Sequence, residues 1–278
     1  MSRVPEGNRF SNIERFSGYE DTYDRHRPAA PQKVVEILTG YLEYRPELVV
    51  DVGCGTGLSS LVWAGHADHI VGVEPNDDMR GKAESKLGEL RDPEVRGSIR
   101  FMSGYSNRLE FADGSADLVT CSQSFHWMEP VSTLNEVARI LKKGGIFAAY
   151  DCDWPPSASW PVEKAYVELL AHADELLAKR QEAEDRAVKR DKESHLARIK
   201  ESGHFRYARE IVFHNIESCD AARYIGLALS QGGLQTVLKL GYDDLDNEIR
   251  KFKALVNEHF HDRKLEVLFS YRMRIGIK

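Results

Sequence analysis

The residues best suited to chemistry lie in a glycine-rich turn near residue 55. The run Asp51-Val52-Gly53-Cys54-Gly55-Thr56-Gly57 completes and follows the apolar, strand-like segment LVVDV. Glycines in such a turn adopt positive φ angles and let a ligand approach the backbone. Glu74 ends the next strand-like segment, 17 residues beyond Gly57, where its carboxylate can accept hydrogen bonds from both hydroxyls of a ribose. The turn and Glu74 together predict a nucleoside-binding site.

A dinucleotide-binding enzyme would need a different glycine spacing. Its pattern, G-x-G-x-x-G, requires a third glycine three residues after the second. That position holds Leu58 when counted from Gly53 and Ser60 when counted from Gly55. An acid at the start of the turn, Asp51, also suits a ligand with an ammonium and a sulfonium better than a pyrophosphate. An NAD-dependent oxidoreductase is therefore the less favoured alternative.

Strand-like and helix-like segments alternate through the first half of the chain. Apolar spacing predicts a helix from Pro31 to Leu42 and another beginning near Gly57. The other segments are strands at 48–52, 70–73, 99–102, 117–121 and 146–150, with helices at 76–90 and through 134–141, the last closed by Lys142 to Gly145. This order predicts an α/β fold with a Rossmann-like, mostly parallel sheet of seven strands and helices on both faces.

The second half changes character after Tyr150. A proline-rich loop leads to a long charged helix from Val162 to about Lys200, which predicts an inserted helical cap. A strand at 209–216 and helical segments at 221–229 and 245–260 follow. The final segment, LFSYRMRIGI, alternates in polarity as an antiparallel strand does. The expected organisation is an arm (1–30), a ligand-binding core (31–152), a cap (153–207) and a completion of the sheet (208–278).

Composition narrows the class of protein. A formal charge of −6 gives no general attraction to nucleic acid phosphates. The sequence contains neither a membrane-spanning run nor an N-terminal signal peptide, and its four cysteines form no CxxC pair. We expect a cytoplasmic monomer or homodimer that binds neither nucleic acid nor membrane and holds no metal.

Three motifs resemble the class I S-adenosylmethionine-dependent methyltransferases: DVGCGTG, the acid in VGVEPNDDM, and DLVTCSQSFHWM. The resemblance covers about residues 15–143. It is similar to the type 11 methyltransferases and, through YDRHRP and FHWM, to the trans-aconitate-methyltransferase-like group. The resemblance implies S-adenosylmethionine as cofactor, S-adenosylhomocysteine as product, and in-line transfer of a methyl group to a small-molecule acceptor.

The resemblance also implies individual roles around the cofactor. The three glycines would pass under its methionine part, Asp51 would orient the ammonium directly or through water, and Glu74 would hold the ribose. Tyr105 and Ser106 stand where the family often has an acid that contacts the adenine amine. Tyr23 and Arg27 would close over the carboxylate. The implied cofactor-binding set is Tyr23, Arg27, Asp51, Gly53, Cys54, Gly55, Thr56, Gly57, Glu74, Pro75, Met79, Tyr105, Ser106, Ser122 and Gln123.

Methyl transfer from a sulfonium needs alignment and exclusion of water more than it needs protein groups. His126 is the candidate general base if the acceptor loses a proton; the alternative is an acceptor-shaping role together with Trp127. His172, His195 and His204 are expected at solvated helix positions. An acceptor pocket of partly apolar character is expected, bounded by Tyr19, Phe125, His126, Trp127, Trp154 and Trp160, with Tyr166 nearby. The alternative from another class is a nucleoside-binding or regulatory protein without turnover.

Overall fold

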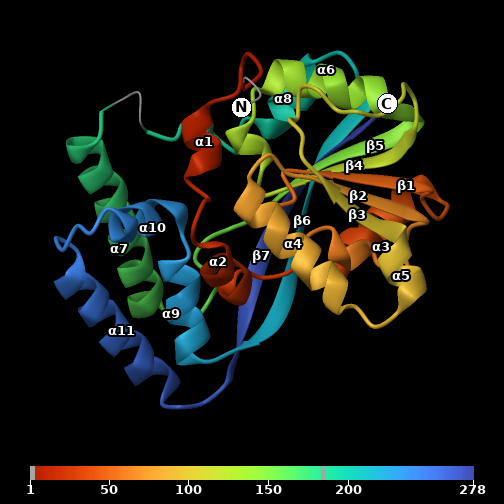
Figure 1. Ribbon diagram of the computed structural model, residues 1–278. Coiled ribbons are helices and arrows are strands. Elements are labelled where there is room, and N and C mark those ends of the chain that lie inside the picture. The colour runs from red at the N-terminus through yellow and green to blue at the C-terminus, as the bar shows by residue number, and fades with distance from the viewer. Residues whose placement is uncertain (1–3, 183–185) are drawn as a thin grey trace.

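A seven-stranded sheet organises the computed structural model, which describes residues 4–182 and 186–278. The strand order is β3-β2-β1-β4-β5-β7-β6 (Figure 1). All neighbouring pairs are parallel except those of β7, which is antiparallel to both β5 and β6. The bounds are β1 Leu48–Val52, β2 His69–Val73, β3 Ile99–Met102, β4 Ala116–Ser122, β5 Leu141–Cys152, β6 Tyr207–Cys219 and β7 Leu265–Ile277. The predicted Rossmann-like sheet with one antiparallel strand is confirmed.

Each central strand contributes to two hydrophobic cores because successive side chains point to opposite faces of a sheet. In β1, Val49 belongs to one core and Val50 to the other, and both are fully buried. The same alternation places Ala148 of β5 in the first core and Phe147 in the second. Burial on both faces explains why these strands are continuously apolar in the sequence.

Helices cover both faces. On the first core lie α3 (Gln32–Leu42), α7 (Trp160–Arg180), α9 (Ala221–Leu229), α10 (Gly232–Lys239) and α11 (Asp246–Phe260). On the second lie α6 (Pro130–Ile140) and α8 (His195–Glu201). The helices α4 (Asp77–Glu89) and α5 (Pro93–Ser98) pack beside β3. The N-terminal arm forms α1 (Phe10–Glu14) and α2 (Glu20–His26), and two short 3₁₀ helices are η1 (Leu61–Trp63) and η2 (Phe125–Trp127).

Two local predictions in the core are wrong. After Gly57 the chain forms turns and the short η1 rather than a long helix. Ser59 and Ser60 are buried there and donate their hydroxyl hydrogen bonds to Asp51, which fixes the segment against the sheet. The run 142–145 does not close α6 but lies inside β5, where the pairing with β4 is irregular.

The predicted continuous helix from Val162 to about Lys200 is wrong as a single element. Helix α7 ends at Arg180, and among the described residues that follow, helix resumes at α8, inside the predicted range. Residues 186–192, RAVKRDK, carry no regular secondary structure; we call them the strap. Helix α7 packs against α10 and α11, so the helical layer draws on residues beyond 153–207 (Figure 1). Helix α10 was not predicted, because its two leading glycines favour a turn.

The described residues include no helix that is both long and apolar enough to cross a membrane.

Candidate functional site

The glycine turn forms a cradle at the carboxyl ends of β1 and β2. Gly53, Gly55 and Gly57 have φ angles of 69°, 55° and 80°, which side chains rarely adopt. A Cβ atom on Gly53 would lie 2.7 Å from Cβ of Ser124. The Gly53 amide donates to the Val73 carbonyl at 2.8 Å and ties the turn to β2. Glycine is therefore required by backbone conformation and by close packing.

Glu74 closes one side of the cradle. Its Oε2 accepts a hydrogen bond from the Gly55 amide at 2.9 Å, and its Oε1 accepts one from the Asn76 amide at 2.8 Å. Each carboxylate oxygen has two lone pairs, so each can also accept a ligand hydroxyl. Burial raises the pKa of Glu74 to about 7, although both amide hydrogen bonds act in the opposite direction.

A cavity above the turn, which we call the cradle cavity, collects most of the predicted cofactor-binding residues. Its walls include twelve of the predicted fifteen: Tyr23, Gly53, Cys54, Gly55, Thr56, Glu74, Pro75, Met79, Tyr105, Ser106, Ser122 and Gln123. Sequence reasoning missed contributions from the arm and from η2 and its flanks, among them Asn8, Asn12, Phe16, Ser124 and Met128. These missed residues come from segments without a glycine motif, and only tertiary packing brings them to the cradle.

Asp51 lies beneath the turn rather than on the cavity wall. It is fully buried, and its carboxylate accepts hydrogen bonds from the hydroxyls of Ser59, Ser60 and Thr120 at 2.6, 2.7 and 2.9 Å. Burial raises its pKa, and the three hydroxyls oppose that shift. Asp51 was predicted to orient a ligand ammonium directly or through water; in this structure its carboxylate holds the turn on the sheet and does not line the cavity. Gly57 is likewise outside the cavity and packs against Phe101.

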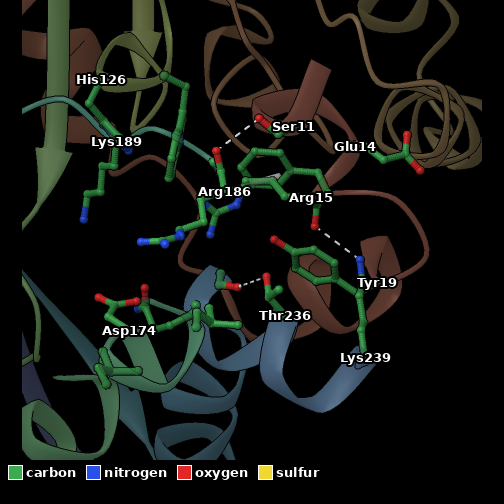
Figure 2. A pocket seen from close by; sticks show the side chains of 18 of the residues that line it. Ser11, Glu14, Arg15, Tyr19, His126, Asp174, Arg186, Lys189, Thr236 and Lys239 are labelled. Carbon is green, nitrogen blue, oxygen red and sulfur yellow. Dashed lines mark hydrogen bonds between the residues drawn. The ribbon is translucent and has the colours of Figure 1, made fainter. Parts of the chain in front are cut away.

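A second and larger cavity of about 940 Å³, the basic cavity, lies beside the first. Its walls come from the arm, η2, the strap, α7 and α10 (Figure 2). Five residues line both cavities: Arg9, Phe16, Tyr23, Gln123 and Trp127. A ligand in the cradle and a ligand in the basic cavity would meet at this shared wall.

Positive charge dominates the basic cavity. Seven Lys and Arg side chains line it, against the two carboxylates of Glu14 and Asp174. Figure 2 shows Arg186 and Lys189 on the strap side, with Asp174 on the opposite wall. The seven are Arg9, Arg15, Arg27, Arg186, Lys189, Lys192 and Lys239. A partly apolar pocket was predicted, and the three cations of the strap were missed because the strap was assigned to a solvated helix.

Several predicted pocket residues occupy other places. Arg27 lines the basic cavity, not the cradle, and donates to the Ser230 carbonyl and to Oε1 of Gln231. Phe125 is a core residue packed against Phe147. Trp160 is 77% exposed at the start of α7. These three predictions are wrong because residue type and chain position do not determine the direction of a side chain.

The other side chains predicted to bound the acceptor pocket lie together in the structure. Tyr19, His126, Trp127 and Trp154 line the basic cavity. The indole Nε1 of Trp154 donates to Oε1 of Gln123 at 3.2 Å, which fixes the glutamine at the shared wall. Tyr166 is fully buried behind this layer, stacked on Trp154, and lines neither cavity.

His126 belongs to a buried cluster around Asp151, at the end of β5. Its Nδ1 lies 3.4 Å from Oδ1 of Asp151, and the Lys192 ammonium lies 2.8 Å from the same oxygen. Burial lowers the pKa of His126 to about 3, although Asp151 partly raises it. The imidazole is therefore neutral at neutral pH. A neutral, weakly basic imidazole fits the acceptor-shaping role better than that of a general base.

His195 corrects the expectation of a solvated position. It is fully buried, and its Nε2 lies 3.8 Å from Oδ2 of Asp151. The ligand atoms of His126, Asp151 and His195 lie within 4.8 Å of one another, as in metal sites. However, Lys192 and the buried guanidinium of Arg274 already neutralise Asp151, so a divalent ion would meet two cations there. His172 and His204 are exposed, as expected, and contact Glu248 and Asn135.

The chain is similar in sequence to known methyltransferases. Residues 50–149 match the family model described as a methyltransferase domain. The chain is 26% identical over 140 residues to a probable S-adenosylmethionine-dependent methyltransferase of Saccharomyces cerevisiae, covering 50% of this chain and 47% of that protein. It is 29% identical over 143 residues to the uncharacterized methyltransferase YcgJ of Bacillus subtilis, covering 51% and 55%.

The whole fold is also similar to solved structures. A putative type II methyltransferase from Anaeromyxobacter dehalogenans superposes with a TM-score of 0.64 at 19% identity, covering 90% of this chain and 97% of that chain. The chain spans about half the length of the curated relatives that it matches. The matching region contains the glycine turn, Glu74 and η2. Residues 50–149 thus match a methyltransferase domain, and the fold of the chain is similar to that of solved methyltransferase structures.

Proposed function

We propose that this protein transfers a methyl group from S-adenosylmethionine to a small acceptor that carries one or more anionic groups. The observation that supports this most is the adjacency of two unlike cavities. One is a nucleoside cradle with glycines and Glu74, and the other is rich in Lys and Arg; both are lined by Tyr23, Gln123 and Trp127. The transferring methyl group would stand at this shared wall.

The cradle suits the cofactor. Glu74 would accept hydrogen bonds from the two ribose hydroxyls, while Pro75 and Met79 would flank the adenine. Tyr105 and Ser106, which also line the cavity, would lie near the adenine amine. Ser122 ends β4 and Gln123 follows it, near the expected position of the sulfonium. The strained backbone of Gln123, with φ of 51°, is consistent with a residue held for function.

The basic cavity suits an anionic acceptor. Carboxylate or phosphate oxygens would be attracted by its cationic side chains, although one of the seven, Lys192, is already paired with Asp151. Transfer would be an in-line displacement in which an acceptor atom forms a bond to the methyl carbon as the carbon–sulfur bond breaks. Where the atom that attacks the methyl carbon is itself an anionic oxygen, no proton has to be removed, and the weakly basic His126 is then not needed as a base. The overall charge of −6 makes nucleic acid an unfavourable partner.

Thermal unfolding with different ligands tests the cofactor. The melting temperature should rise with S-adenosylhomocysteine or S-adenosylmethionine and stay unchanged with NAD. A ligand at 100 times its dissociation constant adds about 2.7 kcal/mol of stability. A rise with NAD alone would refute the assignment.

The acceptor can be identified from its labelled product. The protein is incubated with methyl-labelled S-adenosylmethionine and a metabolite extract that has been separated into anionic and neutral fractions by ion exchange. Label should appear in a product from the anionic fraction. Label only in the neutral fraction would contradict an anionic acceptor. Cofactor binding without any labelled product would favour a regulatory, nucleoside-binding protein.

The affinity for S-adenosylhomocysteine should rise with pH through about 7. Ribose hydroxyls donate to the carboxylate form of Glu74, so binding favours loss of a proton whose pKa in the empty site is about 7. Below that pKa, affinity should fall by up to about tenfold per pH unit. Calorimetric titrations at several pH values measure this, and the Glu74→Gln variant should show a flatter profile. A wild-type affinity that is constant across this range would refute the coupling.

The ionisation of Glu74 should make the ligand-free protein less stable as the pH rises, whereas it makes cofactor binding tighter. The pKa of Glu74 is raised on folding from its usual value of 4.5, so the folded state holds this proton more tightly than the unfolded state does. The tighter binding of this proton therefore adds to the free energy of unfolding. That added stability is fully present below pH 4.5 and is lost as the pH rises to about 7.

The Lys189→Gln variant should raise the KM for the identified acceptor several-fold, by roughly 3–10 times, and leave kcat and cofactor affinity unchanged. Lys189 is an exposed strap residue on the cavity wall, so its loss removes attraction without disturbing the core. Lys200→Gln, at an exposed position of α8 outside the cavity, is the matched control. Equal KM values for both variants would argue against electrostatic recognition by the strap.

A further inference from the structure

Asn12 makes an unusual set of contacts for a residue in a short surface helix. Only 5% of it is exposed, and its amide joins three segments of the chain. Its Nδ2 donates to the Trp127 carbonyl at 2.9 Å and to the Val188 carbonyl at 3.1 Å. Its Oδ1 accepts the Val188 amide at 2.7 Å. The side chain thus satisfies both polar groups of Val188 and ties α1 to η2 and to the strap.

The two ends of this bridge serve different cavities. Asn12 lines the cradle cavity together with its arm neighbours Asn8 and Phe16. The strap carries three of the cations of the basic cavity, Arg186, Lys189 and Lys192. Asn12 is therefore a direct structural link between the covering of the cofactor site and the charged wall of the acceptor site.

Asn12 supplies three of the contacts that hold these two short segments, and each segment has a further attachment to the core. Helix α1 has five residues, too few for an isolated helix to be stable. The strap has no regular structure. Its other attachments to distant segments are the hydrogen bond from the Arg190 amide to the His126 carbonyl at 2.9 Å, the one from Ser11 to the Arg186 carbonyl at 3.2 Å, and the ion pair of Lys192 with Asp151 at 2.8 Å. Lys192 and Arg190 hold the end of the strap to the core, whereas the hydrogen bonds of Val188 described above go to Asn12, so a ligand that holds the arm also restricts the middle of the strap.

We propose that Asn12 is a positioning residue that couples the two cavities: when the cofactor holds the arm in place, Asn12 fixes the strap and so sets the cations that receive the acceptor. This inference rests on the proposed function. It predicts that cofactor binding precedes and favours acceptor binding, since the acceptor site is complete only when the strap is fixed.

Hydrogen exchange with S-adenosylhomocysteine as the probe tests the coupling. In the wild type, saturating probe should slow amide exchange in residues 186–192 by about tenfold or more. In Asn12→Ala, which loses all three hydrogen bonds, the probe should still bind, but exchange in the strap should be fast with or without it. The matched control is Asn8→Ala, because Asn8 fastens the arm to Asn107 and not to the strap. Its strap should respond like that of the wild type once the probe saturates.

A second variant approaches the bridge from the strap. Val188→Pro removes the amide that donates to Asn12 and leaves the arm sequence intact. It should lose strap protection as Asn12→Ala does. In steady-state assays with the identified acceptor, both variants should raise the KM for the acceptor more than that for S-adenosylmethionine, a split that general destabilisation would not produce.

The outcomes separate this inference from the proposed function. If the probe binds and Asn12→Ala retains full strap protection, the coupling is wrong and the proposed function stands. If the probe binds the wild type without slowing exchange in the strap, the coupling is likewise wrong. If the probe does not bind the wild type at all, both proposals fail.

Discussion

Glu74→Ala should weaken binding of S-adenosylhomocysteine by at least about 100-fold. The carboxylate would accept hydrogen bonds from two ribose hydroxyls, and a hydrogen bond to a charged group contributes roughly 1.5–3 kcal/mol. Two such bonds correspond to a factor of about 100 or more, since about 1.4 kcal/mol is tenfold. The variant also leaves the Gly55 and Asn76 amides without their acceptor, which loosens the cradle. Isothermal titration calorimetry measures the loss.

His126→Ala is the contrasting variant for this experiment. His126 is as deeply buried as Glu74 but lines the basic cavity and not the cradle. Its removal should leave cofactor affinity nearly unchanged. Equal losses in the two variants would mean that Glu74 acts through general stability, and the assignment of the ribose contact would have to be abandoned.

Asp51→Ala should lower the free energy of unfolding by about 3 kcal/mol or more, because each buried hydroxyl that loses its acceptor costs roughly 1–3 kcal/mol. Three buried hydroxyls, those of Ser59, Ser60 and Thr120, would lose their shared acceptor. These hydroxyls hold the segment after Gly57 against β1 and β4. Urea denaturation of the ligand-free protein measures the loss as a lower midpoint.

Asp51→Asn is the conservative comparison. It keeps one acceptor oxygen but presents an amide donor to hydroxyls that need an acceptor, so it should cost less than the alanine variant. If Asp51→Ala unfolds at the wild-type urea concentration yet no longer binds S-adenosylhomocysteine, then Asp51 contacts the ligand and the internal role assigned to it here is wrong.

Glu74 and Asp51 differ in how well their positions could be predicted from the sequence. Both acids were assigned to the ligand site: Asp51, at the start of the glycine turn, directly or through water, and Glu74 from the end of the next strand. Glu74 ends a strand, and its position beyond β2 brings it to the cradle. Asp51 lies within β1, where the alternation of side chains and the pairing with Thr120 of β4 direct it under the turn. One acid lies on the cavity wall and the other lies in the core.

For the strap, residues that line a cavity were not predicted to do so. Its charged residues were assigned to a continuous helix because the run lacks glycine and proline, the usual signals that end one. In the structure α7 ends at Arg180, and the strap is held by contacts with Asn12 and with His126, residues far away in sequence. Local propensity contains no information about such partners, so neither the strap nor the basic cavity could be predicted.

The sequence by itself determined the sheet and the cradle of this protein. The predictions used strand periodicity, glycine spacing and an acid at a strand end. Each of these is a pattern within one segment and can be recognised without knowing the fold. Only the tertiary structure decided which side chains face the cavities: it buried His195 and Phe125, exposed Trp160, turned Arg27 towards the basic cavity and brought the strap against the arm. Those outcomes depend on contacts between distant segments, and the pattern of a single segment does not specify them.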